Sequence, residues 1–176
     1  MPARSRRSRK PLPRLSHGET THAGARAIMV DVGKKPASER AALARAALVF
    51  PRGLRDVAWR GAGPKGALAE VARVAGILAA KRTAELIPMC HGLALEHVEV
   101  SLAPRGKNRL EVRCRARTTG RTGVEMEAMV GASVAALTVY DMTKALSKGI
   151  VIERVELLAK SGGKSGDWTR PGRAAR

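Results

Sequence analysis

Aromatic side chains are scarce in this chain. Phe50, Trp59, Tyr140 and Trp168 make up 2% of the 176 residues, and they are not clustered along the sequence. Proteins that hold single-stranded nucleic acid usually stack successive bases on several aromatic rings, so such a platform has little support here. The core must instead be built from Ala, Val, Leu, Ile and Met.

Cysteines and long apolar runs are also few. The two cysteines, Cys90 and Cys114, fit a reducing cytoplasm better than a disulfide scaffold. No run is long and apolar enough to span a membrane, and no apolar signal segment follows the basic N-terminus. We therefore expect a cytoplasmic protein that is neither secreted nor anchored in a membrane.

Acidic residues are outnumbered by basic ones, 15 to 33, which gives a formal net charge of +18. Residues 1–14 hold six basic side chains and no acid, and removing these six charges from +18 still leaves +12. From length and composition we predict a disordered basic tail over 1–20, a single folded domain over 21–167 and a basic C-terminal tail over 168–176. The charge favours polyanionic partners such as nucleic acid, phosphorylated metabolites or acidic surfaces.

Hydrophobic periodicity predicts an α+β fold. The alternating segments 95–102 and 110–118 are typical of half-buried strands, and 27–32 and 150–159 also indicate strands. Segments 66–86 and 124–147 indicate long helices, and an apolar stripe of Leu68, Val71, Ala75 and Leu78 is expected on the first. Propensity alone favours a helix over 38–50, and 51–64 has the Gly, Pro and Arg content of a loop. Strands that pair locally predict an antiparallel sheet with the helices on one face.

The helix predicted over 124–147 carries ionisable groups on an apolar stripe. Glu127, Asp141 and Lys144 follow the same helical spacing as Val130, Val134 and Leu137. Charged groups are costly at such positions unless they are paired, so we interpret them as functional; the alternative is a structural Asp141–Lys144 pair, three residues apart. The helix is also too apolar to have one solvent-exposed side, and we expect another subunit to cover its outer face.

Glycine and lysine recur in the segment KSGGKSGD, 160–167. It is not a Walker A loop, because Leu158 stands where a glycine is needed and no helix can follow Lys164. Its free backbone N–H groups, with Lys160 and Lys164, still favour an anion site over a solvated tail. Lys65 would stand at the start of the first long helix, where a cation can complete an anion site.

Two further segments contain candidate groups. Cys90 and His91 lie together in a turn but match no structural zinc spacing, so we predict no metal site there. His91 is either an acid, base or hydrogen-bond donor, or a turn histidine satisfied locally. Thr122 or Gly123 is expected to cap the second long helix, with Glu125 in its first turn.

In this order, several segments together resemble the cyclic pyranopterin monophosphate synthases of molybdenum cofactor biosynthesis, the MoaC family. They are MVDV (29–32), KG (65–66), VARVAGILAAKRTAELIPMCH (71–91), TGRTGVEMEAM (119–129), ASVAALTVYDMTKA (132–145) and LLAKSGGKSGD (157–167). The chain departs from the usual family pattern at Ala67, where Asp is usual, and at Gly92, where Pro is usual.

The resemblance implies a ferredoxin-like fold, in which a four-stranded antiparallel sheet packs against two long helices, and it makes 38–50 a strand rather than a helix. It implies a homohexamer, a trimer of dimers, with active sites at subunit boundaries. The implied reaction converts (8S)-3',8-cyclo-7,8-dihydroguanosine 5'-triphosphate to cyclic pyranopterin monophosphate and releases pyrophosphate, which is lyase chemistry. We expect that no cofactor is required and that Mg²⁺ can accompany the triphosphate.

By motif position, the resemblance makes 21–167 the catalytic domain and assigns its site residues. The catalytic set is Asp141, Lys144 and Lys65. The substrate-binding set is Met89, Cys90, His91, Glu125, Met126, Glu127 and Lys160. To these we add Lys164 and Arg40 as our own candidates for holding the triphosphate. We hypothesise that Asp141 and Lys144 share proton transfer, with neighbouring cations lowering the pKa of one lysine.

Two other interpretations remain open on the sequence. The chain could be a basic nucleic-acid- or anion-binding protein without catalysis, or a catalytically inactive scaffold of the same family. The first leaves Glu127 and Asp141 unexplained, so we expect nucleic acid to bind only non-specifically, through the basic tail. A salt-dependent shift assay on the tail-deleted protein separates a true binder from an enzyme with an adhesive tail.

Overall fold

The computed structural model describes residues 18–21, 24–61 and 67–171, which belong to two compact units, Met1–Asp31 and Val32–Arg176. In the first unit, strands β1 (Gly18–Thr21) and β2 (Gly24–Ala27) form an antiparallel pair. The strand predicted over 27–32 is wrong, because β2 ends at Ala27 and the backbone of 28–32 is not part of a strand ladder. The boundary predicted at residue 20 falls inside β1, and residues 1–17 lie outside the description.

The second unit is built on a five-stranded antiparallel sheet. Its order is β4 (His97–Arg105), β5 (Arg109–Gly120), β3 (Ser38–Val49), β6 (Val151–Ser161) and the short edge strand β7 (Trp168–Thr169). The strands predicted over 95–102, 110–118 and 150–159 correspond to β4, β5 and β6. β7 lies beyond the domain boundary predicted at residue 167, so the sheet continues into the segment expected to be a tail.

Strand β3 forms against the helix propensity of its sequence. Its inward positions Ala42, Ala44, Ala46 and Leu48 are buried, and they alternate with partly exposed positions. β3 also pairs with β5 on one side and β6 on the other, so its backbone hydrogen bonds outweigh a weak preference for helix. The propensity-based prediction of a helix is wrong, and the strand implied by the resemblance is confirmed.

Segment 51–64 is not a plain loop, because helix α1 (Leu54–Arg60) lies within it. Ala58 is buried in the core, and the buried guanidinium of Arg55 donates to the backbone oxygen of Gly106 at 3.0 Å. These tertiary contacts stabilise a helix of seven residues that its Gly- and Pro-rich surroundings do not predict. The following residues 62–66 lie outside the described ranges.

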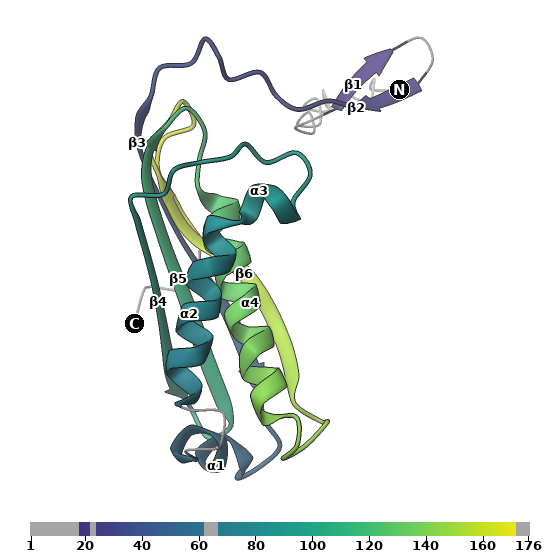
Figure 1. Ribbon diagram of the computed structural model, residues 1–176, viewed down its shortest axis with the longest axis vertical. Helices are drawn as coiled ribbons and strands as arrows, with labels where there is room; N and C mark the ends of the chain where they lie inside the picture. Colours follow the sequence, from purple (N-terminus) through teal and green to yellow (C-terminus); the bar gives the residue numbers. More distant parts are fainter. Residues whose placement is uncertain (1–17, 22–23, 62–66, 172–176) are drawn as a thin grey trace, which may run out of the picture. The chain divides into compact units, whose positions relative to one another are not determined.

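Helices α2 (Leu68–Lys81) and α4 (Glu125–Thr143) lie side by side on one face of the sheet, with the short α3 (Thr83–Leu86) beyond the end of α2 (Figure 1). Glycines allow the close approach of α2 and α4: a Cβ on Gly76 would lie 2.8 Å from the backbone oxygen of Gly131. The apolar stripe predicted on α2 is therefore partly wrong. Small residues such as Ala72 and Gly76 face α4, whereas Val71 and Leu78 are exposed.

The other face of the sheet carries an ion-pair network centred on two glutamates. Glu111 accepts from Arg45, Arg105 and Arg113 at 3.4, 3.3 and 2.8 Å, and its side chain is only 11% exposed. Glu156 pairs with Arg45 and Arg170. Burial alone would raise the pKa of Glu156, but Arg45, Arg170 and Arg154 outweigh that effect and lower it.

No helix in the described part of the chain is both long enough and apolar enough to cross a membrane.

Candidate functional site

The ionisable stripe of α4 runs from the core to the surface. Glu127 is 4% exposed, whereas the side chains of Asp141 and Lys144 are 56% and 55% exposed. A strict seven-residue spacing drifts around a straight helix by about 20° per heptad, or roughly 50° between Glu127 and Lys144. The prediction that all three groups lie on a buried stripe is therefore right at the N-terminal end of α4 and wrong, within one subunit, at its C-terminal end.

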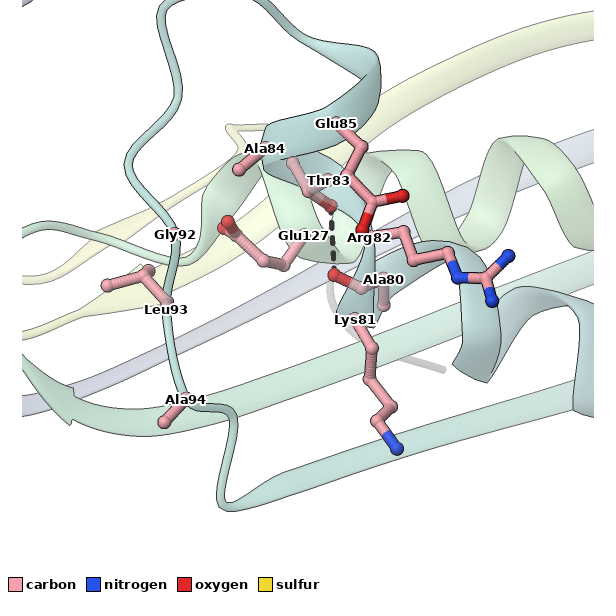
Figure 2. Close-up of a pocket in the computed structure, with 10 residues that line it drawn as sticks. All are labelled: Ala80, Lys81, Arg82, Thr83, Ala84, Glu85, Gly92, Leu93, Ala94 and Glu127. Atoms are coloured by element: carbon pink, nitrogen blue, oxygen red, sulfur yellow. Dashed lines mark hydrogen bonds between the residues drawn. The ribbon is translucent and has the colours of Figure 1, made fainter.

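Glu127 faces a pocket of about 270 Å³ between α4, the end of α2 and α3, and the segment 92–94. Figure 2 shows its side chain turned toward that segment, while Lys81 and Arg82 extend away from it. The hydroxyl of Thr83 donates to the backbone oxygen of Ala80 at 2.9 Å and holds the turn that walls the pocket. Burial raises the pKa of Glu127, and the nearby Glu125 adds to the rise, although a backbone hydrogen bond opposes it.

The segment Met89–His91 lies half-buried close to Glu127. It follows α3 through a turn in which the Cys90 N–H donates to the Ile87 oxygen at 3.0 Å. Burial, and secondly the charge of Glu127, raise the pKa of the Cys90 thiol. Cys90 is thus held as a neutral thiol, which fits a contact residue and not a nucleophile.

Glu125 and Met126 are the first two residues of α4 and directly precede Glu127. The N-cap of α4 is Val124, without a side-chain cap, so the prediction that Thr122 or Gly123 caps the helix is wrong. Instead, the carboxylate of Glu125 folds back over Gly123, where any Cβ would overlap it. Met126 is exposed. Both candidate residues therefore lie at the same end of α4 as Glu127.

Arg40, Lys160 and the glycine-rich loop 162–167 form a second cluster, which we call the anion cluster. Arg40 donates to the Gly120 oxygen at 3.3 Å, and its guanidinium occupies the space that a Cβ on Gly163 would need. Lys160 donates to the Ser165 hydroxyl, while Lys164 is exposed. Gly162 and Gly163 have φ of 84° and 81°, a conformation that favours glycine.

Asp167 closes that loop by accepting from the Gly162 N–H at 3.1 Å. The sequence motifs assign no role to Asp167. Its position five residues after Gly162, at the end of a glycine-rich segment, is the feature of the sequence that indicates such a closure.

Asp141 and Lys144 lie near the opposite end of α4. The Lys144 ammonium donates to Asp141 Oδ1 at 2.6 Å, and this hydrogen bond, together with the carboxylate charge, raises the lysine pKa. The lowered pKa expected for a lysine base is therefore not found for Lys144 in the single subunit. Fourteen residues of helix separate Glu127 from Asp141, about 21 Å at 1.5 Å per residue. Lys65, the third catalytic candidate, lies outside the described residues.

Ala67, one of the two departures from the usual family pattern, stands at the N-cap of α2, where no side-chain hydrogen bond caps the helix. Gly92 lines the Glu127 pocket and has open space around it. Within residues 18–21, 24–61 and 67–171, no three His, Cys, Asp or Glu side chains are grouped as metal ligands.

Most of this chain is similar to proteins of one family. A sequence model described as the MoaC family matches residues 29–163. The chain is 50% identical over 159 residues to a protein of Chloroflexus aurantiacus named cyclic pyranopterin monophosphate synthase, which covers 89% of this chain and 98% of the relative. Proteins of the same name from Bordetella avium and Thermomicrobium roseum are 53% and 48% identical, over 89% and 90% of this chain and 96% and 97% of their own lengths. With matches of this extent, the chain belongs to the MoaC family.

Proposed function

We propose that this chain is a cyclic pyranopterin monophosphate synthase of molybdenum cofactor biosynthesis. It converts (8S)-3',8-cyclo-7,8-dihydroguanosine 5'-triphosphate to cyclic pyranopterin monophosphate and releases pyrophosphate, as a phosphorus–oxygen lyase. The observation that carries this proposal is near-complete alignment, at about half identity, with relatives of that name. The candidate site supports it, because cations and a buried carboxylate lie where the family motifs predict substrate contacts.

The arrangement of the larger unit supports a ferredoxin-like fold. Its elements follow the order β3, α2, β4, β5, α4, β6, and β3 and β5 occupy the centre of the sheet. Both long helices cover the same face (Figure 1). In this proposal β7 is an addition to the edge of a four-stranded core.

The residues divide into a phosphate-binding group and a proton-transfer group. Arg40, Lys160 and Lys164 would hold the triphosphate, since clustered cations and free N–H groups stabilise charge on phosphoryl oxygens. Ring opening and closure require protons to be moved, which Asp141 and Lys144, with Lys65, can supply. In the last step an oxygen of the substrate bonds to the innermost phosphorus as the bond to the leaving pyrophosphate breaks.

The pocket residues would bind the remainder of the substrate. Met89–His91, Glu125, Met126 and Glu127 lie together at one end of α4, as a shared contact surface requires. Proton and phosphoryl transfer of this kind needs no resident cofactor, and Mg²⁺ would arrive with the triphosphate. A cytoplasmic location fits a pathway that starts from nucleotide triphosphates.

Because about 21 Å of helix separates Glu127 from Asp141, the two groups would meet only between subunits. Apolar side chains face outward on the helix layer: Val71, Val74 and Leu78 on α2, and Leu137 on α4. We infer that a second copy covers this layer and joins the Glu127 end of one α4 to the Asp141 end of another. A homohexamer, a trimer of dimers, would contain such pairs.

The direct test incubates the purified chain with the cyclic dihydroguanosine triphosphate and measures pyrophosphate. We expect equimolar pyrophosphate and cyclic pyranopterin monophosphate. Substrate that remains intact with a folded, assembled protein would refute the synthase and support the inactive scaffold.

A complementation test examines the shared site. Asp141→Asn and Lys160→Gln subunits, each inactive alone, are unfolded and refolded together. If each site draws on two copies, about a quarter of the sites in a random mixture are intact. Activity that stays at background, although mixed assemblies form, would contradict the shared site.

A further inference from the structure

Trp168 is the exposed aromatic ring of this chain. All four Phe, Tyr and Trp residues lie in the described ranges: Phe50 is buried, Trp59 and Tyr140 pack against the core, and Trp168 is 38% exposed. Exposure alone indicates little, because single apolar residues are common on protein surfaces. The position of Trp168 is more informative, since it borders the anion cluster.

Strand register places Trp168 beside two members of the anion cluster. Trp168 on β7 is directly opposite Lys160 on β6, and Lys160 is directly opposite Ala42 on β3. Directly opposed residues of antiparallel strands project from the same face of the sheet. Arg40 precedes Ala42 by two positions and therefore shares that face. The indole ring and the two cations thus belong to one row on the face that carries the helices.

The loop 162–167 joins Lys160 to Trp168 as one unit. Besides the Gly162–Asp167 hydrogen bond, the Gly166 N–H donates to the Gly163 oxygen at 3.0 Å. These two hydrogen bonds within six residues keep the Trp168 ring close to the Lys160 ammonium group. A ligand that contacts both would therefore meet them at a fixed spacing.

Arg170 holds the ring in place from one side. Its guanidinium carbon lies 5.6 Å from the centre of the Trp168 ring, within the range of a cation–π contact, and its Nε donates to the Leu157 oxygen at 2.7 Å. A ring fixed in this way loses little conformational entropy when a ligand stacks on it.

We propose that Trp168 is a stacking platform for the flat fused-ring heterocycle of the substrate, next to the cations that hold its phosphates. The proposal rests on the proposed function, because that function supplies a ligand with a guanine-derived ring and a triphosphate. Stacking is tolerant of ring chemistry, so Trp168 contributes affinity for a planar ring, while the specificity for its substituents comes from polar groups.

The test compares Trp168→Ala with Trp168→Phe in steady-state pyrophosphate release. Loss of the ring should raise KM about 10- to 100-fold, the range that corresponds to one base–aromatic stack, with kcat within about threefold of wild type. Phe should restore most of the affinity. Val151→Ala, which removes another exposed apolar side chain from the neighbouring strand β6, serves as the control and should leave KM unchanged.

Inorganic triphosphate, used as a competitive inhibitor, separates stacking from damage to the loop. A stacking platform predicts that its inhibition constant is the same for Trp168→Ala and wild type, because this inhibitor has no ring. Equal weakening of substrate and triphosphate, or an unchanged KM with only a lower melting temperature, would overturn the proposal and make Trp168 a support for the loop or the sheet edge. Failure of the proposed function would differ, since wild-type protein would then release no pyrophosphate.

Discussion

At the scale of single residues, the two carboxylates Glu127 and Asp141 have opposite surroundings. Glu127 is buried at the edge of a pocket, whereas Asp141 is exposed and bonded to Lys144. The free-energy cost of holding a charged carboxylate is high at Glu127 and low at Asp141. Substitutions at the two positions should therefore affect stability differently even though both affect function.

Glu127→Gln is expected to separate stability from activity. The pKa of Glu127 is raised in the folded state, so its protonated form favours folding at low pH, and that contribution is lost as the pH rises through the folded-state pKa. Above about pH 4.5, the ordinary value, wild-type stability should fall relative to the variant. At pH 7 the melting temperature of Glu127→Gln should equal or exceed wild type, while kcat/KM falls about 10- to 100-fold through loss of a charged hydrogen bond.

Thermal unfolding by circular dichroism between pH 4 and pH 8, paired with pyrophosphate release, checks this prediction. Glu125→Gln is the matched control for the stability measurement, because Glu125 is less buried. A Glu127→Gln protein that is less stable than wild type at neutral pH would contradict the burial argument.

Lys144→Arg should abolish most activity without disturbing the fold. Arginine keeps the positive charge and can pair with Asp141, but it does not titrate, so a proton-transfer role would be lost. Turnover should fall about 10²- to 10⁴-fold, the usual contribution of general acid–base catalysis. Lys148→Arg, at another exposed lysine, should behave as wild type in the same assay. Near-normal turnover of Lys144→Arg would remove the proton-transfer assignment and leave an electrostatic role.

At the scale of helices and strands, the N-terminus of α2 lacks a cap. Ala67 at the N-cap has an extended backbone, φ −67° and ψ 113°, which is suited to a capping side chain. Ala67→Asp should therefore raise the free energy of unfolding by about 1 kcal/mol, since a carboxylate can accept from the free N–H groups and favours the helix dipole. Urea unfolding measures this, with Ala67→Leu as the control that adds bulk without an acceptor. No gain over wild type would show that water already satisfies these N–H groups.

The ion-pair network on the face of the sheet opposite the helices should contribute to stability mainly through Glu111. Removing this carboxylate leaves Arg45, Arg105 and Arg113 facing one another without their shared partner. Breaking a buried pair from one side typically costs about 3–5 kcal/mol, so Glu111→Ala should lower the midpoint of urea unfolding strongly. Glu153 pairs with Arg109 and is more exposed than Glu111, so Glu153→Ala should cost less than about 1 kcal/mol of stability. Similar losses for both variants would indicate that the network adds little.

Strand pairing could be predicted from the sequence where polar and apolar residues alternate, as in β4, β5 and β6. β3 could not be predicted from propensity, because Ala, Leu and Arg are good helix formers and only pairing with β5 and β6 makes the segment a strand. α1 was missed for a similar reason, since its stability comes from contacts such as that of Arg55 with Gly106.

The membership of the candidate site stays a prediction from sequence motifs, and its geometry could not be predicted from the sequence. Motifs identified Glu127, Asp141 and Lys160, but local spacing could not show that α4 separates the first two, or that the stripe drifts out of the core. The register that places Trp168 opposite Lys160 depends on the reversal of the chain between β6 and β7, which hydrophobic periodicity does not predict.

At the scale of the whole molecule, the outward apolar side chains of the helix layer should control assembly and activity together. Val74→Glu places a charge at an exposed position of α2 that we expect a second copy to cover. The variant should be smaller than wild type in light scattering and should lose pyrophosphate release. Val57→Glu, at an exposed position on α1, is the control and should retain size and activity. An active, monomeric Val74→Glu protein, or a monomeric wild type at micromolar concentration, would refute the shared site.

Helix α4 carries candidate site residues at both of its ends. In the assembly proposed above, one copy therefore contributes residues to two active sites, each with its own substrate molecule. A subunit whose α4 is defective should inactivate two reaction centres, so a culture that produces equal amounts of normal and defective chains should lose more than half of its synthase activity. Inheritance of such a defect would be partly dominant, although the encoded protein is an ordinary metabolic enzyme.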